Sequence, residues 1–327
     1  MNKKPVIVAT TGIVFLVIGM MASMAIGAKD IPINEIFGAI LGQSDGIHAQ
    51  LVREIRAPRM FCSLLVGGML ALTGTMMQGV LRNPISEPSI MGVTQGATLA
   101  VAISAVSPLI GGMYGNFFMA LLGSAISGVL ILLFSMRNAS MRSLSKILLA
   151  GTALSTFFLS LASVVALLGN RSQELAFWVA GGFRQASWMQ VAFLVIIGGS
   201  FSIASLMISS KINLIHLGDE VAIGLGTSPE RIKMLTILFL IPICGVCVAV
   251  AGNIGFVGLF VPHIIRKLIG NDYRKLMPLS FLWGSVLLLF ADILARKLMA
   301  PYELPVGLFT ACFGVPIFLM LVRKERK

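Results

Sequence analysis

The chain has 327 residues, of which 57% are hydrophobic and only 12% are charged. Because a soluble domain carries about twice that share of charged residues, the composition excludes an ordinary water-soluble protein. The net charge of +12 does not indicate nucleic-acid binding, since the basic residues stand in short clusters between uncharged runs and are not interleaved with aromatic residues. Several of these runs exceed about 18 residues, which is typical of transmembrane helices.

The runs predict an all-α membrane protein with ten transmembrane helices in a single transmembrane domain over residues 1–327. The first run is too long for the apolar core of a signal peptide and is interpreted as an uncleaved span. Asn83 and Pro84 end the second span, and Glu87 and Pro88 are expected to begin the third. The predicted spans cover residues 5–27, 60–81, 89–107, 114–136, 147–169, 187–209, 232–250, 255–269, 276–297 and 304–322.

Ten spans put both termini on the same side of the membrane, and the charges decide which side that is. With a cytoplasmic N-terminus, 17 of the 25 lysines and arginines fall on the cytoplasmic side, in agreement with the positive-inside rule. Both termini are therefore predicted to be cytoplasmic. Five of the other 8 basic residues stand in two clusters beside outer span ends, namely Arg53, Arg56 and Arg59, and Arg296 and Lys297.

The outer arginines allow two interpretations. Arginine at a span end commonly anchors the helix at the lipid headgroups, but its fork of donors also suits bidentate pairing with carboxylates of a docking partner. Asp292, the only carboxylate well inside a predicted span, stands four residues before Arg296. Because a membrane carboxylate needs a partner, this spacing predicts that Asp292 pairs with Arg296 and orients it, with proton relay as the alternative. Glu303 is expected to cap the last span.

The largest predicted cytoplasmic loop covers about residues 210–231. Leu217, Val221 and Leu225 recur at helical spacing, which fits a helix lying on the lipid surface. Asp219 and Glu220 argue against that interpretation, because acidic residues are unfavourable at lipid headgroups. The loop is therefore also a candidate surface for a protein partner.

No metal site, cofactor site or enzyme active site is predicted. Cys244 and Cys247 have C-x-x-C spacing but lie in an apolar run, where packing is the better interpretation. His263 has no second ligand at metal-binding spacing and is expected to be structural. The phosphate-binding motif G-x-x-x-x-G-K-[ST] does not occur in the sequence, so any ATP hydrolysis is expected on a separate subunit.

Three groups of motifs carry a resemblance to a known family. The first is R-x-P-R, then G-G-x-L-A-L-x-G-x-x-x-Q, then R-N-P-x-x-x-P-x-x-x-G-V-x-x-G-A, between Arg56 and Ala97. The second is L-G-D-E-x-A-x-x-L-G from Leu217, and the third includes A-D-I-L-A-R ending at Arg296. Together they are similar to the membrane subunits of type II ATP-binding-cassette importers, the iron-siderophore, haem and cobalamin permease family.

The resemblance implies the partners and the residues that meet them. Arg56, Arg59 and Arg296 would pair with glutamates on the two lobes of an extracytoplasmic substrate-binding protein. The chain would pair with a second permease subunit, identical or paralogous, and with two ATP-binding subunits, in a bacterial cell membrane. A pathway gate is implied at Ser143, Leu144 and Ser145. The segment that engages the ATP-binding subunit would comprise Leu217, Gly218, Asp219, Glu220, Ala222, Leu225 and Gly226.

Two questions stay open at this point. Most members of the family carry ferric siderophores, so this is the expected substrate class, with cobalamin or haem as the alternative. A different class of protein, an ion-coupled secondary transporter, would need several membrane carboxylates or polar coupling residues. Only Asp292 meets that requirement in the sequence. Neighbouring genes for an ATPase and a binding protein would decide between the two classes.

Overall fold

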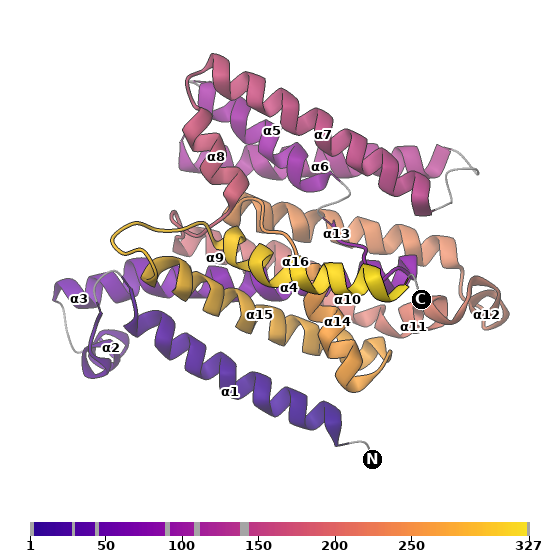
Figure 1. Ribbon diagram of the computed structural model, residues 1–327, viewed down its shortest axis with the longest axis horizontal. Helices are drawn as coiled ribbons and strands as arrows, with labels where there is room; N and C mark the ends of the chain where they lie inside the picture. The colour runs from indigo at the N-terminus through magenta and orange to yellow at the C-terminus, as the bar shows by residue number, and fades with distance from the viewer. Residues whose placement is uncertain are drawn as a thin grey trace.

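The computed structural model describes residues 3–27, 30–42, 46–88, 92–107, 112–137 and 144–325. Within these ranges every regular element is helical, which confirms the predicted all-α fold class. Most of the long helices lie roughly side by side, so their ends gather at two opposite ends of the molecule (Figure 1).

Each predicted span coincides with helical structure, although the boundaries shift by a few residues. The helices concerned are α1 (Lys4–Ala25), α4 (Ala57–Leu81), α5 (Val93–Val106), α6 (Met113–Arg137), α7 (Leu144–Leu168), α9 (Trp188–Phe193) with η4 (Leu194–Gly199) and α10 (Ser200–Met207), α13 (Pro229–Ala251), α14 (Val257–Ile269), α15 (Tyr273–Lys297) and α16 (Val306–Glu325). The shorter elements outside the predicted spans are α2 (Ile33–Ile40), α3 (Ile47–Gln50), η1 (Leu51–Arg56), α8 (Ser172–Ala180), α11 (Ser209–Leu217) and α12 (Asp219–Gly224).

Seven helical stretches among the described residues are long and apolar enough to cross a membrane, and α5 and part of α16 form shorter apolar helices. The helix α14 has only 13 residues, or about 20 Å at helical rise. The expected start of the third span at Glu87 and Pro88 is wrong, because α5 begins at Val93 after a left-handed Gly92. The segment between α4 and α5 is therefore longer than a simple turn.

Helix α4 lies at the centre of the fold and packs against α13, α14 and α15. Most of its residues are buried, including Ser63, Thr73 and Gln78. Helices α5, α6 and α7 pack on one another, and α13 joins this group to α4 through its contacts with α6. The outer helices α1 and α7 instead expose many apolar side chains, as lipid-facing or partner-facing helices do.

Glycines allow the central helices to approach one another closely. A side chain on Gly67 would overlap the carbonyl oxygen of Gly284 on α15, and one on Gly74 would overlap that of Gly258 on α14. Small residues at such positions let two helix backbones come into direct contact, which is a main source of helix association in membranes.

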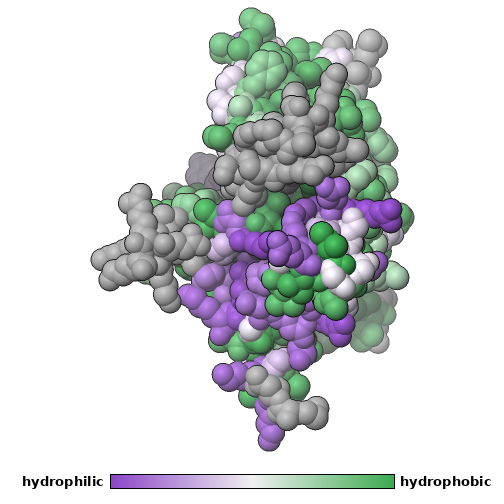
Figure 2. Space-filling view, turned by 90° about the vertical axis from the view of Figure 1, so that its right-hand side faces the viewer, coloured by the Kyte–Doolittle hydropathy of each residue, from purple (hydrophilic) through white to green (hydrophobic). Residues whose placement is uncertain are grey.

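The two ends of the molecule carry different elements. The start of α1 and the end of α16 lie at the same end as α11 and α12, whereas α2 and α3 lie at the opposite end (Figure 1). Figure 2 looks onto the first of these ends and shows hydrophilic residues gathered there around a small hydrophobic group. Exposed charged residues of this region include Lys211, Glu220, Arg231, Lys267, Arg274 and Lys275.

We expect Gly74→Val to reduce the yield of folded protein severely, because the added side chain would force α4 and α14 apart. Overpacking of this kind costs about 1–3 kcal/mol or more in a tight core. The measurement is the fraction of monodisperse protein in detergent and its thermal midpoint. Gly46→Ala is the matched control, since a methyl group there meets open space; equal losses in both variants would contradict the packing argument.

Candidate functional site

The outer arginine cluster forms where α1 ends, α4 begins and α15 ends. The approach to α4 contains a π-turn, η1, in which the amide of Ala57 donates to the carbonyl of Val52. A π-turn shifts the register of the side chains that follow, and it is common at functional sites. Arg56 closes this turn, and Arg59 stands in the first turn of α4.

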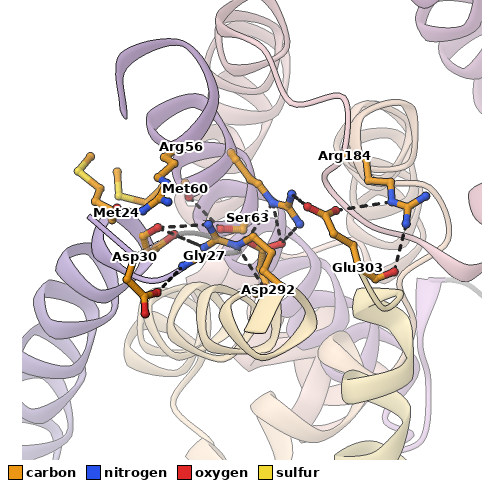
Figure 3. Close-up of polar contacts among 12 residues, drawn as sticks. Met24, Gly27, Asp30, Arg56, Met60, Ser63, Arg184, Asp292 and Glu303 are labelled. Carbon is orange, nitrogen blue, oxygen red and sulfur yellow. Dashed lines mark hydrogen bonds and ion pairs between the residues drawn. The ribbon is translucent and has the colours of Figure 1, made fainter. Parts of the chain in front are cut away.

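Arg59 is held by two carboxylates. Its Nε and Nη2 atoms lie 3.0 and 2.9 Å from Asp292 Oδ1, and its Nη1 donates to Glu303 Oε1 at 2.8 Å. Asp292 is fully buried and Arg59 is only 6% exposed. Glu303 also lies 3.5 Å from Arg184 Nε, so it links the buried arginine to an exposed one (Figure 3). Glu303, which was expected to cap the last span, stands three residues before α16 begins at Val306 and binds two arginines.

The second arginine on Asp292 is Arg296, one turn later in α15. Its Nε lies 3.1 Å from Asp292 Oδ2, which is the contact that the i, i+4 spacing predicts. Its Nη2 also donates to the hydroxyl of Ser23 in α1 at 2.9 Å. One buried carboxylate therefore serves two guanidinium groups from α4 and α15, and Arg296 extends the connection to α1.

Arg56 binds the end of α1 through backbone carbonyls. Its Nη1 donates to the carbonyls of Met24 at 2.5 Å and Ala25 at 2.9 Å (Figure 3). These carbonyls belong to the last turn of the helix, where they lack intrahelical partners and a cation is favourable. Arg56 is 4% exposed. Arg56, Arg59 and Arg296 are thus all buried against their own chain, and contact with a docking partner through them stays a prediction.

Exposed cations surround this buried cluster. Arg184 lies over the ring of Phe177 at 4.4 Å, and Lys297 pairs with Asp30 at 2.7 Å. Hydrogen bonds from Lys297 and from the backbone of Gly27 lower the pKa of Asp30. A cavity of about 240 Å³ opens beside Arg59 and is also lined by Arg171, Glu174, Arg184 and Glu303. This end of the molecule therefore presents a charged mouth beside the buried arginines, in which basic and acidic side chains are paired.

The segment predicted to engage an ATP-binding subunit folds as two short helices, α11 and α12, separated by Gly218. The φ angle of Gly218 is 142°, a value that favours glycine. Leu217 and Leu225 are 69% and 62% exposed, while Ala222 is buried. Glu220 and Gly226 are also exposed. The spacing of Leu217, Val221 and Leu225 suggested one continuous helix, but Gly218 interrupts it. All three side chains are nevertheless exposed.

Asp219 fixes α12 to the rest of the fold. It accepts a short hydrogen bond from Arg82, just after α4, and one of 2.9 Å from Lys233 on α13. Partial burial raises the pKa of Asp219, but the hydrogen bonds and charges of Lys233 and Arg82 outweigh it and hold the pKa below the usual value. Arg82 also donates to the carbonyl of Ile215 in α11 at 2.7 Å. Both short helices are therefore tied to the end of α4.

A further polar group lies one turn inside Arg82 on α4. Gln78 is buried and donates to the carbonyls of Gly258 and Leu259 at the start of α14, each at 3.1 Å. Its oxygen accepts from Arg266 at 3.0 Å. The sequence analysis did not single out Gln78 or Arg82, although both belong to the motifs between Arg56 and Ala97.

A cavity of about 1040 Å³ is lined by α7, α16 and two non-helical segments. One segment joins α4 to α5 and contributes Glu87; the other joins α13 to α14 and contributes Asn253 and Phe256. Irregular backbone within a membrane bundle is tolerated where it lines a cavity, and broken helices often mark a substrate site.

Glu87 is a carboxylate of the bundle interior that was not expected from the sequence. Glu87 is 8% exposed, and it shares a small void with Leu70, which lies eleven residues before the end of α4, and with Cys244 and Cys247 in the middle of α13. Asp292 is therefore not the only carboxylate within the bundle. The sequence at Glu87 and Pro88 does not indicate that the chain folds back into the bundle there.

The remaining predicted residues are placed as follows. Cys244 and Cys247 are buried free thiols, and Cys247 packs against Met69. Among the described residues no group of histidine, cysteine and carboxylate side chains could hold a metal ion. The predicted gate falls at a boundary: Ser143 lies outside the described residues, and α7 begins at Leu144 with Ser145 next. The gate stays a prediction.

The FecCD transport family matches residues 15–324. The chain is also 38% identical over 324 residues to the iron(3+)-hydroxamate import system permease protein FhuB of Bacillus subtilis, covering 98% of this chain and 84% of the relative. It belongs to the FecCD transport family.

Two further comparisons agree with this assignment. The Fe(3+)-citrate import system permease protein YfmD of Bacillus subtilis is 35% identical over 318 residues, covering 96% of this chain and 93% of the relative. A solved inward-facing metal-chelate type ABC transporter superposes with a TM-score of 0.85 at 30% identity, covering 98% of this chain and 99% of that one. As a FecCD member with long apolar helices, the chain is a multi-pass protein of the bacterial cell membrane.

In this FecCD permease, we expect Asp292→Asn to be strongly destabilising, because it leaves Arg59 and Arg296 buried with less negative charge. Removing one partner of a buried ion pair typically costs about 3–5 kcal/mol, which corresponds to a fall of roughly 10 °C in the thermal midpoint. The measurement is thermal unfolding of purified protein in detergent. Asp30→Asn, which breaks an exposed pair with Lys297, is the control and should have little effect. A midpoint for Asp292→Asn within a degree or two of wild type would contradict the structural role.

The stability contributed by Asp219 should depend on pH. Because the folded-state pKa lies below the unfolded value, this contribution is present above about pH 4 and is lost as the pH falls through the folded pKa. The side chain is 44% exposed, so the difference between wild type and Asp219→Asn should be about 1 kcal/mol or less. Unfolding measured from pH 7 to pH 3 should show the two proteins converge at low pH. The exposed neighbour variant Glu220→Gln serves as control, and a pH-independent difference for Asp219→Asn would refute the ion-pair explanation.

Proposed function

We propose that this chain is the permease subunit of an ATP-driven importer that takes up ferric siderophore chelates. The observation that carries this proposal is the match to the FecCD family over residues 15–324, together with full-length similarity to permeases named for ferric hydroxamate and ferric citrate import. ATP is hydrolysed on separate ATP-binding subunits, and the chain itself is a transport subunit.

We propose that the ten helical spans cross the membrane with both termini in the cytoplasm. The position of the start of α1 and the end of α16 at the same end of the molecule supports this arrangement (Figure 1). The hydrophilic surface of that end, with its many basic residues, also supports it (Figure 2), since cytoplasmic loops are enriched in lysine and arginine.

The cytoplasmic contact is proposed to be α11, α12 and the turn that follows, with one ATP-binding subunit engaged by each permease copy. The exposed Leu217, Val221 and Leu225 supply apolar contact area, and the surrounding charged residues supply a polar rim, as protein interfaces commonly do. Because Asp219 and Arg82 tie these helices to α4, movement imposed on α12 by the ATP-binding subunit would act on the central helix of the fold.

The outer contact is proposed to be a substrate-binding protein that presents glutamates to the mouth above α4. Arg56, Arg59 and Arg296 form the base of this mouth, and the exposed Arg184 lies beside them. Direct pairing of a partner glutamate with Arg59 or Arg296 requires that partner to compete with Asp292. In the undocked form, the buried arginines organise the mouth, and the exposed cations are available to attract acidic groups.

The pathway is proposed to run between two copies of the permease, identical or paralogous, past the 1040 Å³ cavity and the gate at Ser143, Leu144 and Ser145. A cavity of this size is at the upper end of the range for small-molecule sites, as a bulky metal chelate requires. Haem or cobalamin is the alternative substrate. For an ion-coupled transporter, Asp292 is a poor proton carrier because it is already shared by two arginines.

We expect uptake of a ferric siderophore by proteoliposomes to require ATP, the ATP-binding subunits and the binding protein together. The measurement is accumulation of radiolabelled iron supplied as hydroxamate, citrate and catecholate chelates, with haem and cobalamin assayed in parallel. Omission of each component in turn is the control, and each omission should reduce uptake to background.

Other outcomes would redirect the assignment. Uptake that persists without ATP and collapses with a proton or sodium ionophore would contradict the importer proposal and favour an ion-coupled transporter. ATP-dependent uptake of haem or cobalamin, with no ferric siderophore transported, would keep the importer and withdraw the siderophore assignment.

A further inference from the structure

The large cavity between the two non-helical segments has an unusual charge. Among its described lining residues, Glu87 is the only charged one. The other described lining residues are uncharged. Most are apolar, and a few are polar, such as Gln95, Ser155 and Thr156. The outer mouth differs, because its cavity is lined by three arginines and two glutamates. A ligand that passes from the mouth into the larger cavity would therefore move from a surface of paired basic and acidic side chains to one with a single acidic group among its described lining residues.

The backbone after α4 delivers Glu87 to this cavity. Arg82 adopts a left-handed conformation, and the side chain of Asn83 accepts the amide of Ile85 at 3.0 Å, which turns the chain sharply. The segment then runs back between α4 and α13, where Glu87 reaches the level of Leu70 and Cys244. Glu87 lines both the small void beside α13 and the large cavity. It is the only acidic residue among the described residues that line either space.

An ionisable residue inside a membrane bundle is costly, and it commonly faces a cavity used by the transported ligand. Ferric chelates differ in charge in a way that such a residue can distinguish. Three hydroxamate groups balance the charge of ferric iron, and a pendant amine then makes the chelate cationic. Citrate and catecholate chelates keep an excess of negative charge. A carboxylate in the path attracts the first kind and repels the second.

We propose that Glu87 is a specificity-determining residue that favours neutral and cationic ferric chelates, such as hydroxamates, over anionic ones during passage through the permease. This inference rests on the proposed importer function and narrows its substrate class. The permease then adds a charge filter to the selection made by the binding protein, and the filter acts on the chelate as it enters the central cavity.

The expected effect is large enough to measure. A unit charge about 10 Å from a carboxylate, at an effective dielectric constant of about 20, changes an equilibrium roughly tenfold. We therefore expect wild-type permease to transport a cationic chelate at least about tenfold faster than an anionic one of the same shape. Iron coordination stays constant among such chelates, so a difference that disappears when Glu87 loses its charge reports the charge of the chelate rather than the size of the added acyl group.

The test uses one tris(hydroxamate) chelate in three forms: with a free pendant amine, with the amine acetylated, and with the amine succinylated. These forms are cationic, neutral and anionic. Uptake of radiolabelled iron is measured in proteoliposomes that contain the complete transporter, with the binding protein saturated by each chelate so that capture does not limit the rate. The variants are Glu87→Gln, Glu87→Asp and, as a neutral lining control, Ser155→Ala.

The inference predicts that wild type, Glu87→Asp and Ser155→Ala transport the cationic and neutral forms faster than the anionic form, while Glu87→Gln transports all three forms at similar rates. A preference in Glu87→Gln equal to that of wild type would overturn it. Equal uptake of the three forms by wild type would also overturn it, even if Glu87→Gln fails to fold. Absence of ATP-dependent uptake for every form would instead overturn the proposed function, and this inference with it.

Discussion

The sharing of one buried carboxylate by two arginines determines how the outer end of this permease is built. Burying a charge costs several kcal/mol unless it is paired and hydrogen-bonded, and Asp292 supplies this pairing to both Arg59 and Arg296. The three residues come from α4 and α15, the central helix and a principal neighbour. Arg296 and Arg56 then bind Ser23, Met24 and Ala25 at the end of α1. The electrostatic requirement of a single carboxylate therefore fixes the relative positions of three helix ends.

The opposite end of α4 uses the same arrangement in a more exposed setting. Asp219 accepts from Arg82, which follows α4, and from Lys233, in the first turns of α13. In both places one carboxylate is shared by two cations from different helices, and in both places α4 supplies one of the cations. Since the glycine contacts of α4 with α14 and α15 leave little room for independent movement, α4 is well suited to act as a rigid body between the cluster around Arg59 and the two short helices α11 and α12.

Hydrophobic runs predicted most of the fold, because the length of a helix that crosses a bilayer is fixed by the thickness of the hydrocarbon core. The motifs also led to the segment around Gly218 and to Arg56, Arg59 and Arg296. The sequence did not indicate how deeply individual charged side chains are buried in the fold. Arg56, Arg59 and Arg296 were expected at a surface, yet they are buried against their own chain. Arg56 binds the last carbonyls of α1, and Arg59 and Arg296 bind Asp292. Glu87 was expected to begin the third span, yet it lies in the non-helical segment before α5 and is buried within the bundle. The burial of a side chain depends on how segments that are distant in the sequence pack together, and a single sequence does not report this packing directly.

The two interruptions of the helices explain why the cavity lies where it does. Helix α5 has 14 residues and α14 has 13, so neither fills the length that α4 or α15 spans with 25 residues. The space left by these short helices is occupied in part by the segments that carry Glu87 and Asn253, and the remainder is the cavity. Backbone groups in those segments need partners that a helix would have supplied. One is met by Trp178, whose carbonyl accepts the amide of Asn253. Next to that segment, Gln78 binds the carbonyls of Gly258 and Leu259 in the first turn of α14. The cavity thus exists because specific polar contacts make an interrupted helix tolerable inside an apolar bundle.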